Sequence, residues 1–160
     1  NGNQKVLVNN SDVTEAIRSP EVTALVSVVA SEKPIREFLT SQQKKMGELG
    51  GLVAEGRDIG TTVFPNAELK VFLTASANER AKRRLNDLTT QGFPNPGLKK
   101  LEEEITARDK MDSTRKISPL LKADDAIELI TDGMNIEQVI KTLCELFRMK
   151  IPNEAWPNPD

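Results

Sequence analysis

Arg57 and Asp58 stand side by side in the sequence EGRDIGT of residues 55–61, directly after the apolar run of residues 52–54. We interpret that run as a strand that ends at a glycine and presents both side chains. The guanidinium offers a planar fork of donors that suits a phosphate. The carboxylate accepts hydrogen bonds from an exocyclic amine or a ring N–H. A turn that holds a structural ion pair is the alternative, and these residues alone do not decide between the two.

A second group consists of Arg108, Asp112 and Arg115, which are spaced i, i+4 and i+7. This spacing predicts that the three side chains share one face of a helix. Two arginines that flank a carboxylate suit a phosphorylated sugar, with the cations on the phosphate and the acid on a hydroxyl. Taken alone, the same spacing is more typical of a solvated, salt-bridged helix face.

A third group places four cations within five residues at the start of an expected helix, and its members are Arg80, Lys82, Arg83 and Arg84. Such a helix can close over phosphates as a lid and offset the charge of a phosphoryl transition state. Taken alone, a charge run of this kind is more often a solvated face. The fourth group is the pair of Ser27 and Arg36, in the expected N-terminal helices. These two residues suggest a function only when they are considered together with the other groups.

Composition excludes several kinds of chemistry. The chain has no histidine and one cysteine, which excludes a disulfide within the chain, a Cys/His zinc site and a histidine base. Many arginines with a few paired acids suit a reaction in which the protein positions reactants and stabilises charge. Phosphoryl transfer is a reaction of that kind.

Charge and hydropathy restrict the partners. The formal net charge is -2 over 160 residues, whereas general nucleic-acid binding requires a basic field. We find no apolar run near the ~20 residues of a membrane span and no signal peptide. We therefore expect no nucleic-acid or membrane partner and a cytoplasmic location. The chain begins at Asn1 rather than at a methionine, and we expect it to be a fragment.

Strand and helix signals alternate over the later two thirds of the chain. The elements that we expect are strands at residues 4–8, 69–73 and 126–130 and helices at about 20–30, from 34, from 77, at 98–114 and at 136–149. Ser76 and Glu79 form a predicted capping box, and Asn135 is the predicted cap of the last helix. This order predicts an α/β protein with right-handed crossovers and a parallel sheet. Ligands of such sheets bind at the carboxyl ends of the strands, where we expect Arg57 and Asp58.

The chain resembles bacterial-type cytidylate kinase from about residue 3 to residue 150. The matching stretches are DVTEAIR at 12–18, VAEGRDIGT at 53–61, VFPNAELKVFLTAS at 63–76, ERAKRR at 79–84, Arg108-Asp109 with Asp112 and Arg115, PL at 119–120 and ADDA at 123–126. The resemblance implies transfer of the γ-phosphate of ATP, with Mg²⁺, to CMP or dCMP in pyrimidine nucleotide metabolism. It also implies a P-loop nucleoside-monophosphate-kinase fold with a helical lid and an inserted CMP-binding lobe, built from a small antiparallel sheet and helices.

The resemblance also implies a role for each candidate residue. The positions that read the cytosine base are held by Ser27, Arg36 and Asp58. The positions that bind the acceptor phosphate are held by Arg57 and Arg115, and those near the sugar by Arg108 and Asp112. The lid positions that approach the ATP donor are held by Arg80 and Arg84. Catalysis is thereby expected from Arg80, Arg84, Arg57 and Arg115.

The sequence departs from the family in lacking its first strand, its donor loop, and the serine and arginine that follow and also contact the monophosphate. No glycine is followed by lysine, so the donor loop Gly-x-x-x-x-Gly-Lys-[Ser/Thr], which cradles the triphosphate and ligates Mg²⁺, is absent. We therefore expect a partial CMP-binding lobe at 1–48, a kinase core at 49–150 without its first strand, a lid at about 77–118 and a flexible tail at 151–160. A tail with the sequence PNEAWP at 152–157 resembles, in addition, the cyanobacterial fusion of pantoate ligase with cytidylate kinase.

Two alternatives remain open at this point. One is a related kinase for another small phosphoacceptor, with an altered base site. The other is a non-enzymatic remnant that binds CMP or a protein partner, because this chain alone is expected to be incomplete for catalysis. A complete kinase of this type is expected to be a monomer.

Overall fold

The computed structural model describes residues 5–152, without the side chain of Ser27. Its elements in chain order are β1 (Leu7–Val8), β2 (Ser11–Asp12), a 3₁₀ turn (Ala16–Arg18), α1 (Pro20–Ser31), α2 (Lys33–Met46), a π-helical turn (Ile59–Val63), β3 (Val71–Thr74), α3 (Ala77–Thr90), α4 (Leu98–Thr114), β4 (Ile127–Ile130) and α5 (Ile136–Lys150). The chain is therefore a mixed α/β protein. Most of the expected flexible tail at 151–160 lies outside the described residues.

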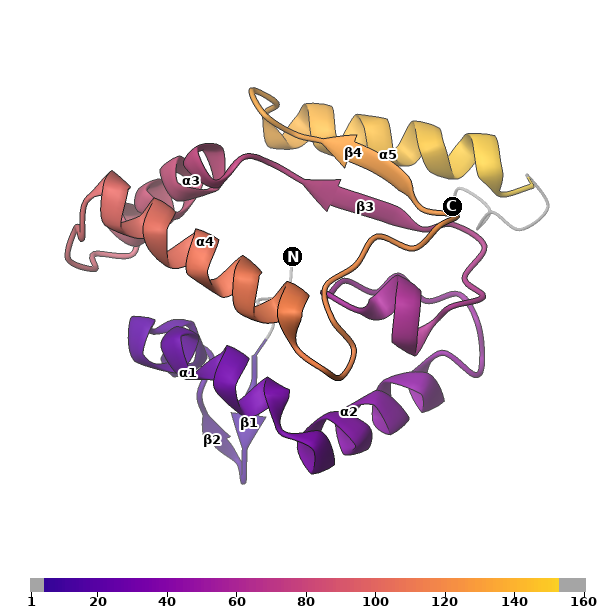
Figure 1. Cartoon of the computed structure of the whole chain (residues 1–160), viewed down its shortest axis with the longest axis horizontal. Helices are drawn as coiled ribbons and strands as arrows, with labels where there is room; N and C mark the ends of the chain where they lie inside the picture. Colours follow the sequence, from indigo (N-terminus) through magenta and orange to yellow (C-terminus); the bar gives the residue numbers. More distant parts are fainter. Residues whose placement is uncertain (1–4, 153–160) are drawn as a thin grey trace.

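Two small sheets are present among the described residues. Strands β3 and β4 pair in parallel with Val71 opposite Ile127, and α3 and α4 form the connection between them (Figure 1). The predicted parallel pairing is thus confirmed. Strands β1 and β2 pair antiparallel around Asn9 and Asn10, which both have positive φ. Asparagine tolerates this left-handed conformation better than most residues, which explains the turn.

The predicted strand at residues 52–54 is wrong. The structure has no regular element there, and Val53 is 96% exposed. An apolar run becomes a strand only where a neighbouring strand accepts its hydrogen bonds. Within residues 5–152, β3 pairs with β4 alone. The Arg57 and Asp58 side chains are therefore carried by a loop, and the π-helical turn that follows fixes this loop through bonds from Thr62 and Val63 to the Asp58 carbonyl.

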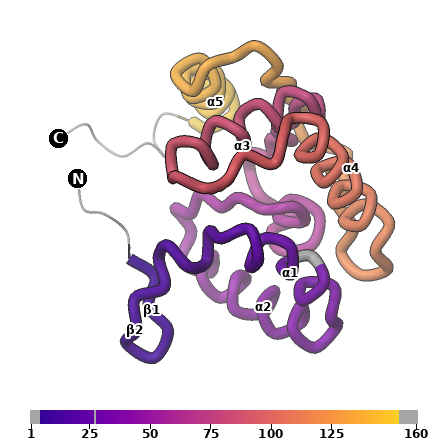
Figure 2. Tube along the Cα trace, turned by 90° about the vertical axis from the view of Figure 1, so that its left-hand side faces the viewer, coloured from indigo at the N-terminus to yellow at the C-terminus, as the bar shows by residue number. Residues whose placement is uncertain are grey.

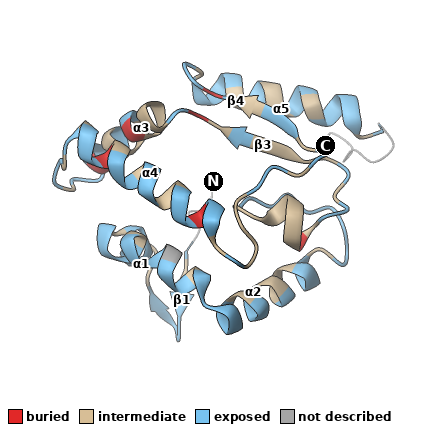
Figure 3. Cartoon of the chain, in the orientation of Figure 1, coloured by how far each residue is buried: buried red, intermediate tan, exposed pale blue. Residues whose placement is uncertain are grey.

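The helices form two groups. Figure 2 shows α3, α4 and α5 on one side and α1, α2 and the β1–β2 hairpin on the other. The interior lies mainly between α3 and α4, where Ala81, Leu88 and Leu101 are buried (Figure 3). None of the helices within residues 5–152 is long and apolar enough to cross a membrane.

The predicted helix caps are largely confirmed. Asn135 and Gln138 exchange both bonds of a capping box at the start of α5. At the start of α3 the Ser76 hydroxyl accepts from the Glu79 N–H, but the Ser76 N–H donates to Asp132 instead. The Ser76 side chain and the Ser76 N–H both lower the pKa of the Asp132 carboxyl. Only half of the predicted capping box therefore forms at this helix.

Arg83 attaches α3 to the turn after β4. Its Nη1 donates to the Thr131 hydroxyl at 3.0 Å, and its Nη2 donates to the Thr131 carbonyl at 2.6 Å. Thr131 itself is buried and bonds to the Thr74 carbonyl. Arg83 is therefore a structural residue of the helix and not one of the phosphate-facing cations that the charge run suggests.

We predict that Arg83→Met lowers the free energy of unfolding by about 1–3 kcal/mol, because it removes two hydrogen bonds from a charged donor to the buried Thr131. Urea unfolding followed by circular dichroism measures the change. Lys82→Met, at the exposed neighbouring position, is the control and should stay within about 0.5 kcal/mol of wild type. Equal losses in both variants would contradict the role assigned to Arg83.

Candidate functional site

The centre of the candidate site is Asp112, in the last turn of α4, which is only 3% exposed. Its carboxylate faces three arginines. Oδ2 lies 2.7 Å from Arg57 Nε and 3.8 Å from Arg108 Nε, and Oδ1 lies 3.5 Å from Arg115 Nη1. The structure thus brings Arg57, Arg108 and Arg115 together around one buried charge, although they come from separate parts of the sequence.

Arg115 reaches this place by a route that the helical spacing does not predict. Helix α4 ends at Thr114, and Arg115 is extended, with φ -64° and ψ 146°. Its side chain is held by a bond of 2.6 Å from Nε to the carbonyl of Ser118, a residue with a φ of 48°. Arg115 is thus the first residue after the helix, three positions beyond Asp112, and the turn that follows it supplies the carbonyl that holds its guanidinium beside Asp112.

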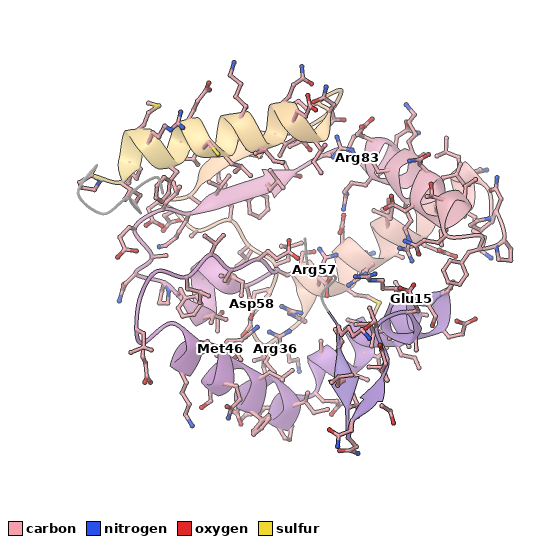
Figure 4. All side chains as sticks on the ribbon, turned by 180° about the vertical axis from the view of Figure 1, so that it is seen from behind. Glu15, Arg36, Met46, Arg57, Asp58 and Arg83 are labelled. Carbon is pink, nitrogen blue, oxygen red and sulfur yellow. The ribbon has the colours of Figure 1, made fainter. Side chains whose placement is uncertain are left out.

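Asp58 forms a second, partly separate centre. Its Oδ2 lies 2.6 Å from Arg36 Nη1, and its Oδ1 lies 3.8 Å from Arg115 Nη2. Arg36 is itself fixed, because its Nε donates to the Ala30 carbonyl at 2.9 Å. Figure 4 shows Arg36, Arg57 and Asp58 close together at the middle of the molecule. Ser27 lies in α1, and its side chain is outside the described part of the structure.

Asp109 is a third carboxylate that sequence reasoning did not single out. Its Oδ2 lies 2.6 Å from Arg80 Nη2, and its Oδ1 lies 3.6 Å from Arg57 Nη1. The available signal was its position three residues before Asp112, which places both acids on neighbouring positions of one helix. Arg84 is close enough to Arg108 for its charge to contribute to lowering the Arg108 pKa.

The site carries more positive than negative charge. Five arginines (36, 57, 80, 108 and 115) surround three aspartates (58, 109 and 112), an excess of two charges. Burial and the neighbouring Arg57 lower the pKa of Arg108, and burial and Arg36 lower that of Arg115. The surroundings thus disfavour the charged form of both arginines, and an added anion would reverse this effect.

Several buried polar atoms lack a hydrogen-bond partner within the described structure. They are Arg108 Nε, Arg115 Nη2 and Asp112 Oδ2. Arg57 Nε is only 2.7 Å from Asp112 Oδ2, but its N–H is not directed at that oxygen, so this contact is an ion pair without a hydrogen bond. Buried donors without acceptors are costly, and the two arginine donors indicate a site that an anionic ligand completes.

No metal site accompanies these residues. In the part of the chain that the structure describes, no three His, Cys, Asp or Glu side chains gather in a group that suits a metal ion. The three aspartates are instead committed to arginines. We therefore assign no step to Mg²⁺ in this chain.

Comparison with known proteins places the chain in context. A family model described as cytidylate kinase matches residues 1–149. The chain is 64% identical, over 99% of its length, to a protein of Prochlorococcus marinus (strain MIT 9303) named bifunctional pantoate ligase/cytidylate kinase. A protein of the same name from Synechococcus sp. (strain CC9605) is 61% identical over 99% of the chain. The chain spans only 32% and 33% of the length of these two relatives.

The buried charge at Asp112 leads to a prediction about stability. Asp112→Asn keeps the shape of the side chain but removes the negative charge that three arginines share. Removing one partner of a buried ion pair costs about 3–5 kcal/mol, so we expect a loss of this size in urea unfolding. Asp124→Asn, at an exposed position, should change stability by about 0.5 kcal/mol or less. A loss at Asp112 no larger than this control would contradict the central role of its carboxylate.

Proposed function

The chain belongs to the cytidylate kinase family, and from that premise we propose that its residues form the acceptor side of an enzyme that transfers the γ-phosphate of ATP to CMP or dCMP. The observation that carries the proposal is the set of partly buried arginines around the buried Asp112, with its excess positive charge and its unpartnered donors. Such a set suits a phosphate dianion better than any neutral ligand.

The acceptor phosphate is assigned to Arg57 and Arg115, with Arg108 beside them. Asp112 holds the three guanidinium groups in place before the ligand arrives, so little reorganisation is needed when a phosphate binds. Both Nη atoms of Arg57 and the unpartnered Arg115 Nη2 are the donors proposed to turn towards the phosphate. The Asp112 carboxylate would also accept a hydrogen bond from a sugar hydroxyl.

The base is assigned to Asp58 and Arg36, together with Ser27. The contact of 2.6 Å between Arg36 and Asp58 fixes the carboxylate, which can then accept a hydrogen bond from the exocyclic amine of cytosine. Uracil carries a carbonyl at that position and offers no such donor. Selectivity for cytosine over uracil therefore follows from the hydrogen-bonding polarity of one partly buried acceptor, Asp58.

The donor side is assigned to Arg80 and Arg84 on α3, in the proposed lid at about 77–118. Mg²⁺ bridges the phosphates of ATP in this class of reaction and neutralises their charge, but the residues described here contribute no site for it. The role proposed for Arg80 and Arg84 is to stabilise the negative charge of the transferred phosphoryl group. The division into a lobe at 1–48 and a core at 49–150, a cytoplasmic location and a monomeric state remain predictions.

Asp58→Ala tests the base site in a full-length kinase that carries these residues together with a phosphate-donor loop. We expect CMP affinity to fall by about 1.5–3 kcal/mol, the value of a hydrogen bond to a charged group, while ATP affinity stays near wild type. Isothermal titration calorimetry measures both. Asp124→Ala serves as the exposed control. Equal weakening of CMP and ATP would make Asp58 a structural residue only.

Arg57→Lys and Arg115→Lys test the phosphate site in the same protein. Lysine keeps the charge but loses the planar fork of donors, so the change is not conservative at a phosphate. We expect both variants to bind cytidine as wild type does and to lose affinity for CMP. Unchanged CMP affinity and turnover in either variant would remove its arginine from the phosphate site.

A further inference from the structure

Asp109 connects the two sides of the proposed reaction. One of its carboxylate oxygens lies 2.6 Å from Arg80, on the donor side, and the other lies 3.6 Å from Arg57, on the acceptor side. We propose that Asp109 is a positioning residue that sets the spacing between these two arginines across the transferred phosphoryl group. This inference rests on the proposed function.

Each arginine is held on its other edge. Arg57 Nε is in contact with Asp112 Oδ2 at 2.7 Å. Arg80 Nε donates to the Ala75 carbonyl at 3.0 Å. Because one edge of each guanidinium is already fixed, the shared Asp109 carboxylate restricts the rotation that remains. Losing that carboxylate therefore frees the rotation of two cations at once.

Asp109 is itself carried by a rigid part of the fold. It lies in α4, which packs against α3 around the buried residues Ala81 and Leu101. Arg80 directly precedes Ala81 in the first turn of α3. The helix pair thus fixes the carboxylate and one arginine, and the second arginine, on the loop before the π-helical turn, is attached to this pair through Asp109 and Asp112.

The charge of Asp109 makes its role measurable. A carboxylate beside two phosphate-binding arginines repels the phosphates while it orders the arginines. Removing its charge should therefore strengthen the binding of anions and weaken catalysis. A merely structural ion pair predicts the opposite for binding, because damage to the site weakens substrate binding and turnover together.

The test is Asp109→Asn in a full-length kinase that carries these residues and a donor loop. We expect kcat to fall by about 10- to 100-fold, since misplacing a positioning group by about 1 Å has an effect of that order. We expect KM for CMP and for ATP to stay equal to wild type or to fall by about two- to fivefold, because one nearby negative charge is gone. Asp109→Glu, which keeps the charge and changes the reach, should keep wild-type KM values and recover only part of kcat.

Glu102→Gln is the matched control. Glu102 is another acid of α4 that contacts α3, through a bond of 3.0 Å from Asn78, and neither residue belongs to the arginine cluster. It should change neither kcat nor KM. Thermal unfolding of each variant shows that the fold is retained.

A second measurement separates this inference from the proposed function. In the 160-residue chain, Asp109→Asn should bind inorganic pyrophosphate about two- to fivefold more tightly than wild type in calorimetry, because the repulsion exists whatever the reaction is. If the full-length wild-type protein shows no CMP-dependent turnover, the proposed function is wrong. Three results would overturn the role of Asp109. The first is a raised KM together with a lowered kcat, and the second is unchanged kinetics. The third is pyrophosphate binding that is unchanged or weaker in Asp109→Asn.

Discussion

The rest of the site depends on the burial of one carboxylate. An aspartate taken out of water must be paired, because an isolated buried charge is strongly unfavourable. Asp112 is paired with arginines from three places, which are its own helix, the loop before the π-helical turn and the loop after α4. The pairing is supported by the turn after α4, where Ser118, a non-glycine residue, takes a positive φ. The Ser118 carbonyl accepts from Arg115 Nε and so holds this guanidinium beside the charge that the helix buries.

The same constraint extends through the molecule as a series of alternating charges. In spatial order its members are Arg36, Asp58, Arg115, Asp112, Arg57, Asp109 and Arg80. The series starts on α2, ends on α3, and begins and ends with a cation. Charges in such a network polarise and restrain one another, so the members act as a unit more than as separate pairs. Arg108 also faces Asp112 and brings the cluster to five arginines and three aspartates, so an anion with two negative charges matches its excess charge.

Local signals predicted the elements better than the site. Helix starts were readable because caps such as Ser76 and Asn135 act within three residues, and the parallel pairing of β3 and β4 followed from the strand–helix order. The strand expected at 52–54 failed because a strand depends on a partner elsewhere in the chain. Arg115 does lie beside Arg108 and Asp112, but it stands just beyond the helix, and helical spacing cannot foresee the Ser118 carbonyl that holds its side chain. Asp109 and Arg83 show the same limit, because the acid that bridges two elements and the cation that anchors a helix are recognised only from distant contacts.

The charged series also matters because apolar burial is limited. The accessible surface is 12104 Å², whereas a compact monomer of 17.7 kDa exposes about 8,000 Å². Exposed apolar side chains include Leu73 and Ile130 on the parallel sheet and Val53 on the loop. Among the described residues the buried apolar cluster joins α3 to α4, and Arg36, Asp58 and Arg115 add charged contacts between the α1–α2 side and the α3–α4 side. The phosphate proposed for this site would neutralise the surplus charge there and so reduce the repulsion between the two sides. On that proposal, ligand binding and the contact between the two sides depend on the same charges around Asp112.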